Sequence, residues 1–220
     1  MQLRQPQLRQ PQRRHSARNV VAAAVAAAIL VACATGPSDE EVSAKASAVL
    51  KASFKEQGQA KLDRLAQDDT QKTCSQYSGT AVPKDAAERI EKANLASIKW
   101  PADGKYVGDW ANGEKIAQEG RGMQYSDDPK GPVGANCYAC HRLSPQELSF
   151  GTIGPSLYQF GKLRGYTDEV RKYAYGKIYN AEAYSACTNM PRFGHSDILS
   201  EQQIRDVVAL LMDPASPVNK

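Results

Sequence analysis

Five consecutive residues near the middle of the chain place the strongest constraint on how it can fold. Cys137 and Cys140 are separated by two residues, and His141 follows the second cysteine directly. Two thiols at this spacing can each add to one vinyl group of a haem, while the adjacent imidazole binds the iron. The chain around such a motif would have to pack about a covalently attached haem c, so the sequence predicts a redox protein.

The same cysteine pair would also suit a redox dithiol or half of a zinc site. A zinc site needs further ligands, and beyond the N-terminal region only His195, Cys74 and Cys187 remain to supply them. Neither of those cysteines belongs to a second Cys-x-x-Cys pair. The histidine directly after the second cysteine therefore favours haem attachment.

The N-terminal region has the pattern of an export signal. Residues 1–19 contain five arginines and no acidic residue, and residues 20–32 are an unbroken run of Val, Ala, Ile and Leu. This run is shorter than the about 20 residues that span a bilayer, so a cleaved signal peptide over residues 1–33 is expected. No apolar residue closely follows Arg13 and Arg14. We therefore expect ordinary secretion of the unfolded chain to the periplasm rather than twin-arginine export.

Cys33 leaves two ways of processing open. Residues 30–33 resemble a bacterial lipobox, in which Cys33 would carry a lipid, whereas residues 32–34 resemble an A-x-A cleavage site. We expect membrane association only if Cys33 is lipidated. Without its first 33 residues the chain has 23 basic and 24 acidic residues. The basic character thus belongs to the leader and gives no reason to expect a nucleic-acid partner.

Two cysteines, Cys74 and Cys187, are left once Cys33 and the haem motif are set aside. In an oxidising compartment a remaining pair favours a disulfide. Two unpaired cysteines, buried or reactive, are the alternative, because the sequence does not give the distance between their Cα atoms.

A change of composition near Pro101 divides the mature chain. Residues 34–101 are predicted to form a helical N-terminal extension, and residues 102–220 the haem domain. Three helices are expected in the extension, marked in turn by Ser38 and Glu41, by Leu62 and Leu65, and by Ala86, Ile90 and Ala93 after Pro83. The extension shows no repeat or catalytic grouping, so we expect it to serve packing or partner binding.

Two further helices are predicted near the ends of the haem domain. Asn112 is expected to cap the first, which places small and apolar side chains on one face: Gly113, Ile116, Ala117 and Gly120. Ser200 and Gln203 form a capping-box pattern before the second, whose apolar residues are Ile204, Val207, Val208 and Leu211. The small residues of the first helix would let the two pack closely.

The order of these features resembles that of a class I cytochrome c. A helix over residues 110–120 precedes the Cys-x-x-Cys-His motif, and residues 154–157, residues 190–194 and an amphipathic helix follow it. Within that superfamily the chain is most similar to the SoxX family, the monohaem subunits of the SoxAX complex of bacterial thiosulfate oxidation. Residues 151–161, 173–194 and 206–220 carry this resemblance. It implies an all-α class I cytochrome c fold with one haem c, here preceded by a helical extension.

The resemblance also implies roles for residues around the iron. In class I cytochromes a proline carbonyl accepts a hydrogen bond from the ligating histidine, and Pro155 stands at the matching position. Met190 stands where the family has its second axial ligand, and a thioether there favours ferrous iron. Met123, Met212 and His195 are competitors, although packing or a loop hydrogen bond is the ordinary interpretation of each.

As a SoxX-like chain the protein would be the electron-transfer subunit of an L-cysteine S-thiosulfotransferase. Its partners would be SoxA, on which the family places the sulfur chemistry, the carrier protein SoxYZ, whose cysteine is coupled to thiosulfate, and an electron-accepting cytochrome. The alternatives are a free-standing periplasmic electron carrier and a haem-based sensor. A sensor would need a displaceable axial ligand, so carbon monoxide binding distinguishes it.

Overall fold

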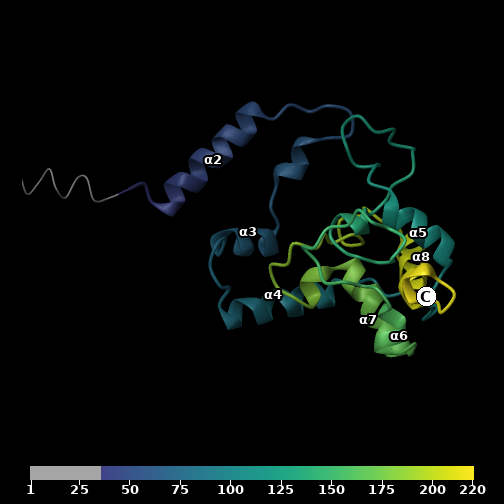
Figure 1. Cartoon of the computed structure of the whole chain (residues 1–220). Helices are drawn as coiled ribbons and strands as arrows, with labels where there is room; N and C mark the ends of the chain where they lie inside the picture. Colours follow the sequence, from purple (N-terminus) through teal and green to yellow (C-terminus); the bar gives the residue numbers. More distant parts are fainter. Residues whose placement is uncertain (1–35) are drawn as a thin grey trace, which may run out of the picture. The chain divides into compact units, whose positions relative to one another are not determined.

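A computed structural model describes residues 36–220, so the predicted signal peptide and Cys33 lie outside the described residues (Figure 1). Regular structure within residues 36–220 is helical, apart from an isolated bridge between Gln57 and Ala60. The predicted all-α class is confirmed. None of the helices in this part of the chain is long and apolar enough to cross a membrane.

The chain divides into two units, Met1–Phe54 and Lys55–Lys220. Of the first unit, the structure describes α2 (Asp39–Ser53) and the residues that flank it. The predicted capping box is present: the Ser38 hydroxyl accepts from the Glu41 N–H (3.2 Å), and the Glu41 carboxylate accepts from the Ser38 N–H (3.1 Å). The larger unit contains the second part of the predicted extension together with the whole predicted haem domain.

The second part of the extension forms three helices in the larger unit. The leucine pair lies in a short 3₁₀-helix, η1 (Leu62–Leu65), and α4 (Lys84–Ala96) begins directly after Pro83 as predicted. The buried face of α4 consists of Ala86, Ile90 and Asn94, whereas the predicted Ala93 is exposed. Between them lies α3 (Asp69–Gln76), which the sequence analysis did not predict.

The first helix of the predicted haem domain, α5 (Trp110–Gln118), begins two residues before Asn112. The prediction that Asn112 caps it was wrong, because Asp109 is the N-cap. The Asp109 carboxylate accepts from the backbone N–H groups of Ala111 (2.7 Å) and Asn112 (3.3 Å). Gly120 lies beyond the end of the helix and is exposed.

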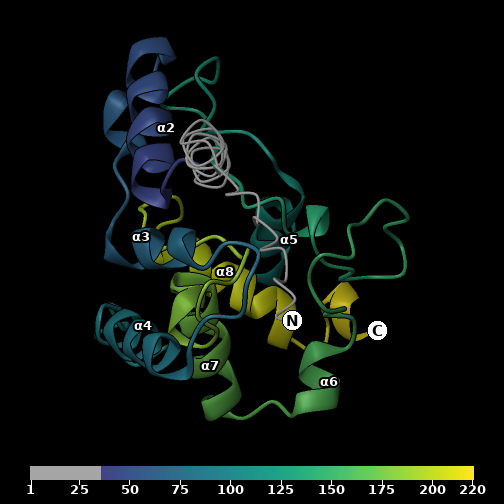
Figure 2. The same ribbon diagram turned by 90° about the vertical axis from the view of Figure 1, so that its left-hand side faces the viewer.

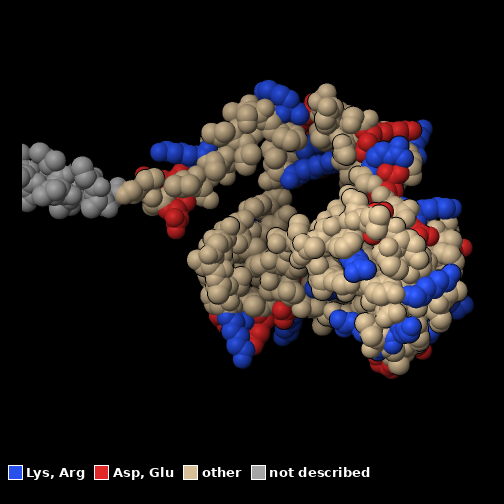
Figure 3. All heavy atoms as spheres, in the orientation of Figure 1, with Lys and Arg blue, Asp and Glu red and all other residues tan. Residues whose placement is uncertain are grey.

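The last long helix, α8 (Glu201–Met212), is capped by Ser200 and Gln203 as predicted, and its apolar face is buried. The remaining elements are α6 (Phe160–Arg164), α7 (Asp168–Tyr179) and the short 3₁₀-helices η2 (Cys137–Ala139), η3 (Ala181–Ala183) and η4 (Pro217–Asn219). Figure 2 shows α8 between α5 and α7. Charged side chains of both signs share the face drawn in Figure 3, separated by uncharged surface.

The core of the larger unit forms where α5 crosses α8, as the small residues predicted. A Cβ atom on Gly113 would lie 2.0 Å from the carbonyl oxygen of Asp206, so the two backbones are in direct contact. The buried Asp206 carboxylate accepts from the N–H of Asp109 (2.9 Å), and the Arg205 carbonyl accepts from the N–H of Gly108 (2.9 Å). Hydrogen bonds and steric fit thus fix α5 against α8.

We predict that Gly113→Ala destabilises the haem-loaded protein by about 2 kcal/mol or more, because overpacking exceeds the helix-propensity gain of about 1 kcal/mol. Thermal unfolding followed by circular dichroism measures the change. Asn112→Ala, on the exposed side of the same helix, should change stability by less than about 0.5 kcal/mol. An unchanged Gly113→Ala midpoint would contradict the close approach.

Candidate haem site

The cysteines and the histidine of the motif lie on one tight turn. The N–H groups of Cys140 and His141 both donate to the Cys137 carbonyl, at 3.2 and 2.9 Å. The turn therefore brings two thiols and an imidazole together within a single helical turn, η2 and the two residues after it. Neither Cys137 nor Cys140 forms a disulfide.

This turn is anchored to the end of α5. The N–H of Ala135 donates to the carbonyl of Ile116 (2.9 Å), and the N–H of Asn136 donates to the carbonyl of Glu119 (2.9 Å). Asn136 has a φ of 45°, in the left-handed region that asparagine tolerates better than most residues. Tyr138, between the cysteines, is buried. The packing of α5 on α8 thus helps to fix the position of the haem motif.

The ring of His141 is held by two residues of the following loop. Its Nδ1 lies 2.7 Å from the carbonyl oxygen of Pro155, the residue that the resemblance indicated. Because a carbonyl can only accept, Nδ1 carries the proton in this hydrogen bond and the lone pair of Nε2 is left for a metal. A Cβ atom on Gly154 would lie 2.1 Å from Cε1 of the ring, so only glycine fits there. The histidine is oriented for coordination.

The cysteine pair is poorly suited to the alternative chemistries. Burial raises the pKa of the Cys137 thiol to about 12, and the neighbouring Cys140 acts in the same direction. A raised pKa disfavours the thiolate form on which disulfide exchange depends. Among the described residues, the one group of three potential metal ligands is Cys74, Glu182 and Cys187, away from the motif. The structure thus offers the motif no set of additional protein ligands for zinc.

Met190 lies in the connection between η3 and α8, partly buried against the core. The residues that follow it are fixed to the end of α7, because the N–H groups of Gly194 and His195 both donate to the Tyr179 carbonyl at 3.0 Å. A Cβ atom on Gly194 would lie 2.3 Å from the Tyr179 ring. The structure thus gives this loop a defined path.

The three competitors of Met190 have other surroundings. Met212 is 2% exposed within the buried face of α8, and Met123 is 37% exposed. The His195 ring has Nδ1 3.4 Å from the Ser97 hydroxyl and Nε2 3.9 Å from the Asp68 carboxylate. Burial lowers the pKa of His195, with the cation of Arg192 acting in the same direction. Met212 is thus a core residue, Met123 a surface residue and His195 a hydrogen-bonded loop histidine.

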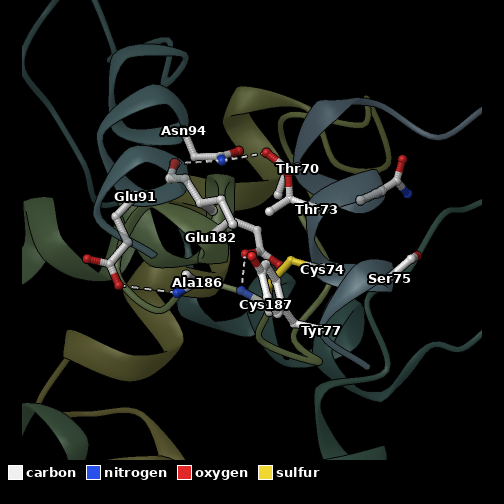
Figure 4. The surroundings of a disulfide bond; sticks show 12 residues. Thr70, Thr73, Cys74, Ser75, Tyr77, Glu91, Asn94, Glu182, Ala186 and Cys187 are labelled. Atoms are coloured by element: carbon white, nitrogen blue, oxygen red, sulfur yellow. Dashed lines mark hydrogen bonds between the residues drawn. A yellow bond between two sulfur atoms is a disulfide. The ribbon is translucent and has the colours of Figure 1, made fainter. Parts of the chain in front are cut away.

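Cys74 of α3 and Cys187 form a disulfide in the structure, with 5.3 Å between their Cα atoms (Figure 4). This bond joins the extension to the loop that carries Met190. The sequence analysis did not identify the two residues that support the same loop, Asp68 and Glu182. Asp68 had a readable signal, since Asp68 and Gln71 form a capping box at the start of α3.

The donor set fits a c-type haem: two thiols and an imidazole on one turn, the imidazole oriented by a carbonyl, and a thioether on a second ordered loop. The fold and this site define a class I cytochrome c. Residues 110–213 match the cytochrome c family. An uncharacterised lipoprotein of Aquifex aeolicus (strain VF5) is 39% identical over 156 residues, which are 70% of this chain and 74% of that protein. The chain belongs to the cytochrome c family: it is an electron carrier with covalently bound haem c.

We predict that Gly154→Ala lowers the yield of haem-loaded, low-spin protein severalfold, because the added methyl would occupy the position of the His141 ring. Absorption spectra and haem content per polypeptide measure the effect. Ile153→Ala is the matched control, since this neighbour is 74% exposed and its loss should leave the spectrum unchanged. A Gly154→Ala protein with wild-type spectrum and haem content would show that the ring is not confined there.

Proposed function

We propose that this chain is a SoxX-type subunit, the monohaem electron-transfer partner in a SoxAX complex of thiosulfate oxidation. The supporting observation is that the segments resembling SoxX form one connected part of the molecule. The N–H of Gln159 donates to the carbonyl of Val218 (2.7 Å), and the N–H of Gly194 donates to that of Tyr179 (3.0 Å). In addition α6 and α7 both pack on α8. The segments that carry the resemblance thus form one contiguous frame, which includes the loop of Pro155 and the loop of Met190.

In this proposal the haem is attached through Cys137 and Cys140, and His141 and Met190 are the axial ligands. The haem would carry one electron at a time, and the protein would bind and orient the haem. Pro155 orients the imidazole of His141 through its carbonyl, which raises the basicity of the ring. Two protein ligands close the coordination sphere, which suits electron transfer rather than substrate binding.

The sulfur chemistry of the proposed complex would take place on SoxA. Coupling thiosulfate to a SoxYZ cysteine thiol forms one sulfur–sulfur bond and releases a pair of electrons and a proton. A monohaem subunit would accept these electrons one at a time and pass them to an electron-transport cytochrome. The fold of this chain supports that role because its candidate cofactor residues all serve to hold and orient one haem.

Export and lipid attachment belong to the same proposal. The Aquifex relative is named a lipoprotein, and residues 30–33 of this chain resemble a lipobox. We propose that a signal over residues 1–33 directs the chain to the periplasm. Lipidation of Cys33 would tether the protein to a membrane surface without a spanning helix.

Mild affinity purification of the mature chain from its native host, followed by haem staining of a denaturing gel, tests the partner. The proposal predicts a second, larger haem-stained band and reduction of the haem by thiosulfate when the carrier protein is present. A lone haem band that thiosulfate does not reduce would leave a free-standing electron carrier. The mass of the purified N-terminal peptide shows whether Cys33 carries a lipid.

We predict that Met190→Ala abolishes the ferric sulfur-to-iron charge-transfer band and lets the reduced haem bind carbon monoxide. The wild-type protein should show the band and bind little carbon monoxide, because both axial positions are occupied. Met123→Ala is the control, since Met123 is 37% exposed and lies outside this loop. Persistence of the band in Met190→Ala would refute Met190 as ligand, and ready binding to the wild-type haem would favour a sensor.

A further inference from the structure

We propose that helix α3 is a positioning element for the Met190 loop (residues 186–195), and that it controls how readily the Met190 sulfur leaves the haem iron. The inference rests on the proposed ligation by Met190. Two bonds carry it, both made by α3 and its N-cap residue: the disulfide between Cys74 and Cys187, and the ion pair between Asp68 and Arg192. They hold the chain three residues before Met190 and two residues after it.

The anchor before Met190 combines a covalent bond with two carboxylates. Cys187 is bonded to Cys74, and its N–H donates to the Glu182 carboxylate at 2.6 Å. The preceding N–H, of Ala186, donates to Glu91 of α4 at 3.2 Å. Figure 4 shows Glu182 beside the disulfide and Glu91 of α4 bonded to the Ala186 N–H. Glu182 is buried and Cys187 is half-buried, so this end of the loop is tied to the interior of the protein.

The anchor after Met190 is a partly buried ion pair, because the Asp68 side chain is 40% exposed. The Arg192 guanidinium lies 2.7 Å from Oδ2 of Asp68, and the Arg192 side chain is 11% exposed. The other oxygen of Asp68, Oδ1, accepts from the Gln71 N–H at 2.8 Å and so caps α3. One carboxylate therefore starts the helix and holds the loop. Because the Arg192 side chain is largely withdrawn from water, this pair is less screened than a fully exposed one.

Together the two anchors bound a short span that contains Met190. A cavity of about 760 Å³ lies between this span and α3, lined among others by Thr188, Asn189 and Met190 on the loop side. The side of the span that faces this cavity is therefore unpacked, whereas Met190 also packs against the core. With little packing on that side, the span depends on the anchors at its two ends to stay closed.

This opening determines how an external ligand competes for the iron. A ligand such as imidazole binds only after Met190 has left, so its apparent dissociation constant equals the intrinsic constant divided by the open fraction. A charge-assisted hydrogen bond stabilises the closed loop enough that its loss raises the open fraction about tenfold. Loss of either anchor should thus be measurable while the haem stays attached.

The test is an imidazole titration of the ferric, haem-loaded full-length protein, with the sulfur-to-iron charge-transfer band recorded alongside. In Asp68→Asn the amide oxygen can still cap α3, but the negative charge facing Arg192 is lost. In a Cys74→Ser/Cys187→Ser double variant the covalent anchor is lost. For each, we expect the apparent dissociation constant for imidazole to fall about tenfold, with the band weakened at high temperature.

The matched control is Asp85→Asn, which removes the exposed Asp85–Arg89 ion pair of α4, also 2.7 Å long. It should leave the imidazole titration within about twofold of wild type. A wild-type band with identical titrations in all variants would overturn the positioning role. Equal tightening in Asp85→Asn would also overturn it, since the effect would then come from global stability. Absence of the band from the wild type would instead refute Met190 ligation, and with it the proposed coordination.

Discussion

The direct contact between α5 and α8 is the constraint on which both candidate ligand loops depend. Gly113 brings the α5 backbone against Asp206, and the buried Asp206 carboxylate holds the start of α5. With α5 fixed at this crossing, its far end can orient the haem motif through the carbonyls of Ile116 and Glu119. On the other side, α8 supports α6 and α7, whose ends lead into the Pro155 and Met190 loops. A single helix crossing therefore sets the frame for the histidine and methionine sides together.

The two sides of the site are held by different kinds of interaction. On the histidine side the backbone is the main support: carbonyls accept from the turn, and the Pro155 carbonyl fixes the ring of His141. Such contacts depend on local geometry more than on side-chain identity. On the methionine side the loop is held by the Glu182 carboxylate, the Asp68–Arg192 ion pair and the disulfide, to which the extension contributes Asp68 and Cys74. On the methionine side a single substitution can therefore remove one interaction, whereas on the histidine side it acts through local geometry, as at Gly154.

Sequence reasoning succeeded where the determining signal is local. The capping boxes at Ser38 and Ser200 lie within four residues, and the apolar period of α8 was visible over about two turns. It failed at Asn112 because two polar residues compete to start α5, and Asp109, which also reaches Asp206, is the one that caps it. Helix α3 was missed because it is polar throughout and has no buried face. Instead of an amphipathic pattern, α3 has a capping box at its start and a disulfide to a residue 113 positions away along the chain.

The residues of the candidate site likewise divide into those that the sequence predicts and those that it does not. The motif at Cys137, Cys140 and His141 is readable because haem attachment requires those residue types at that spacing. The pairing of Asp68 with Arg192 is not readable, since nothing in either local sequence specifies a partner so distant along the chain. This difference bears on the extension, which a small electron carrier would not need for haem attachment. Asp68, Cys74 of α3 and Glu91 of α4 all contact the Met190 loop, so the extension adds support to a loop that Tyr179 and Glu182 also hold.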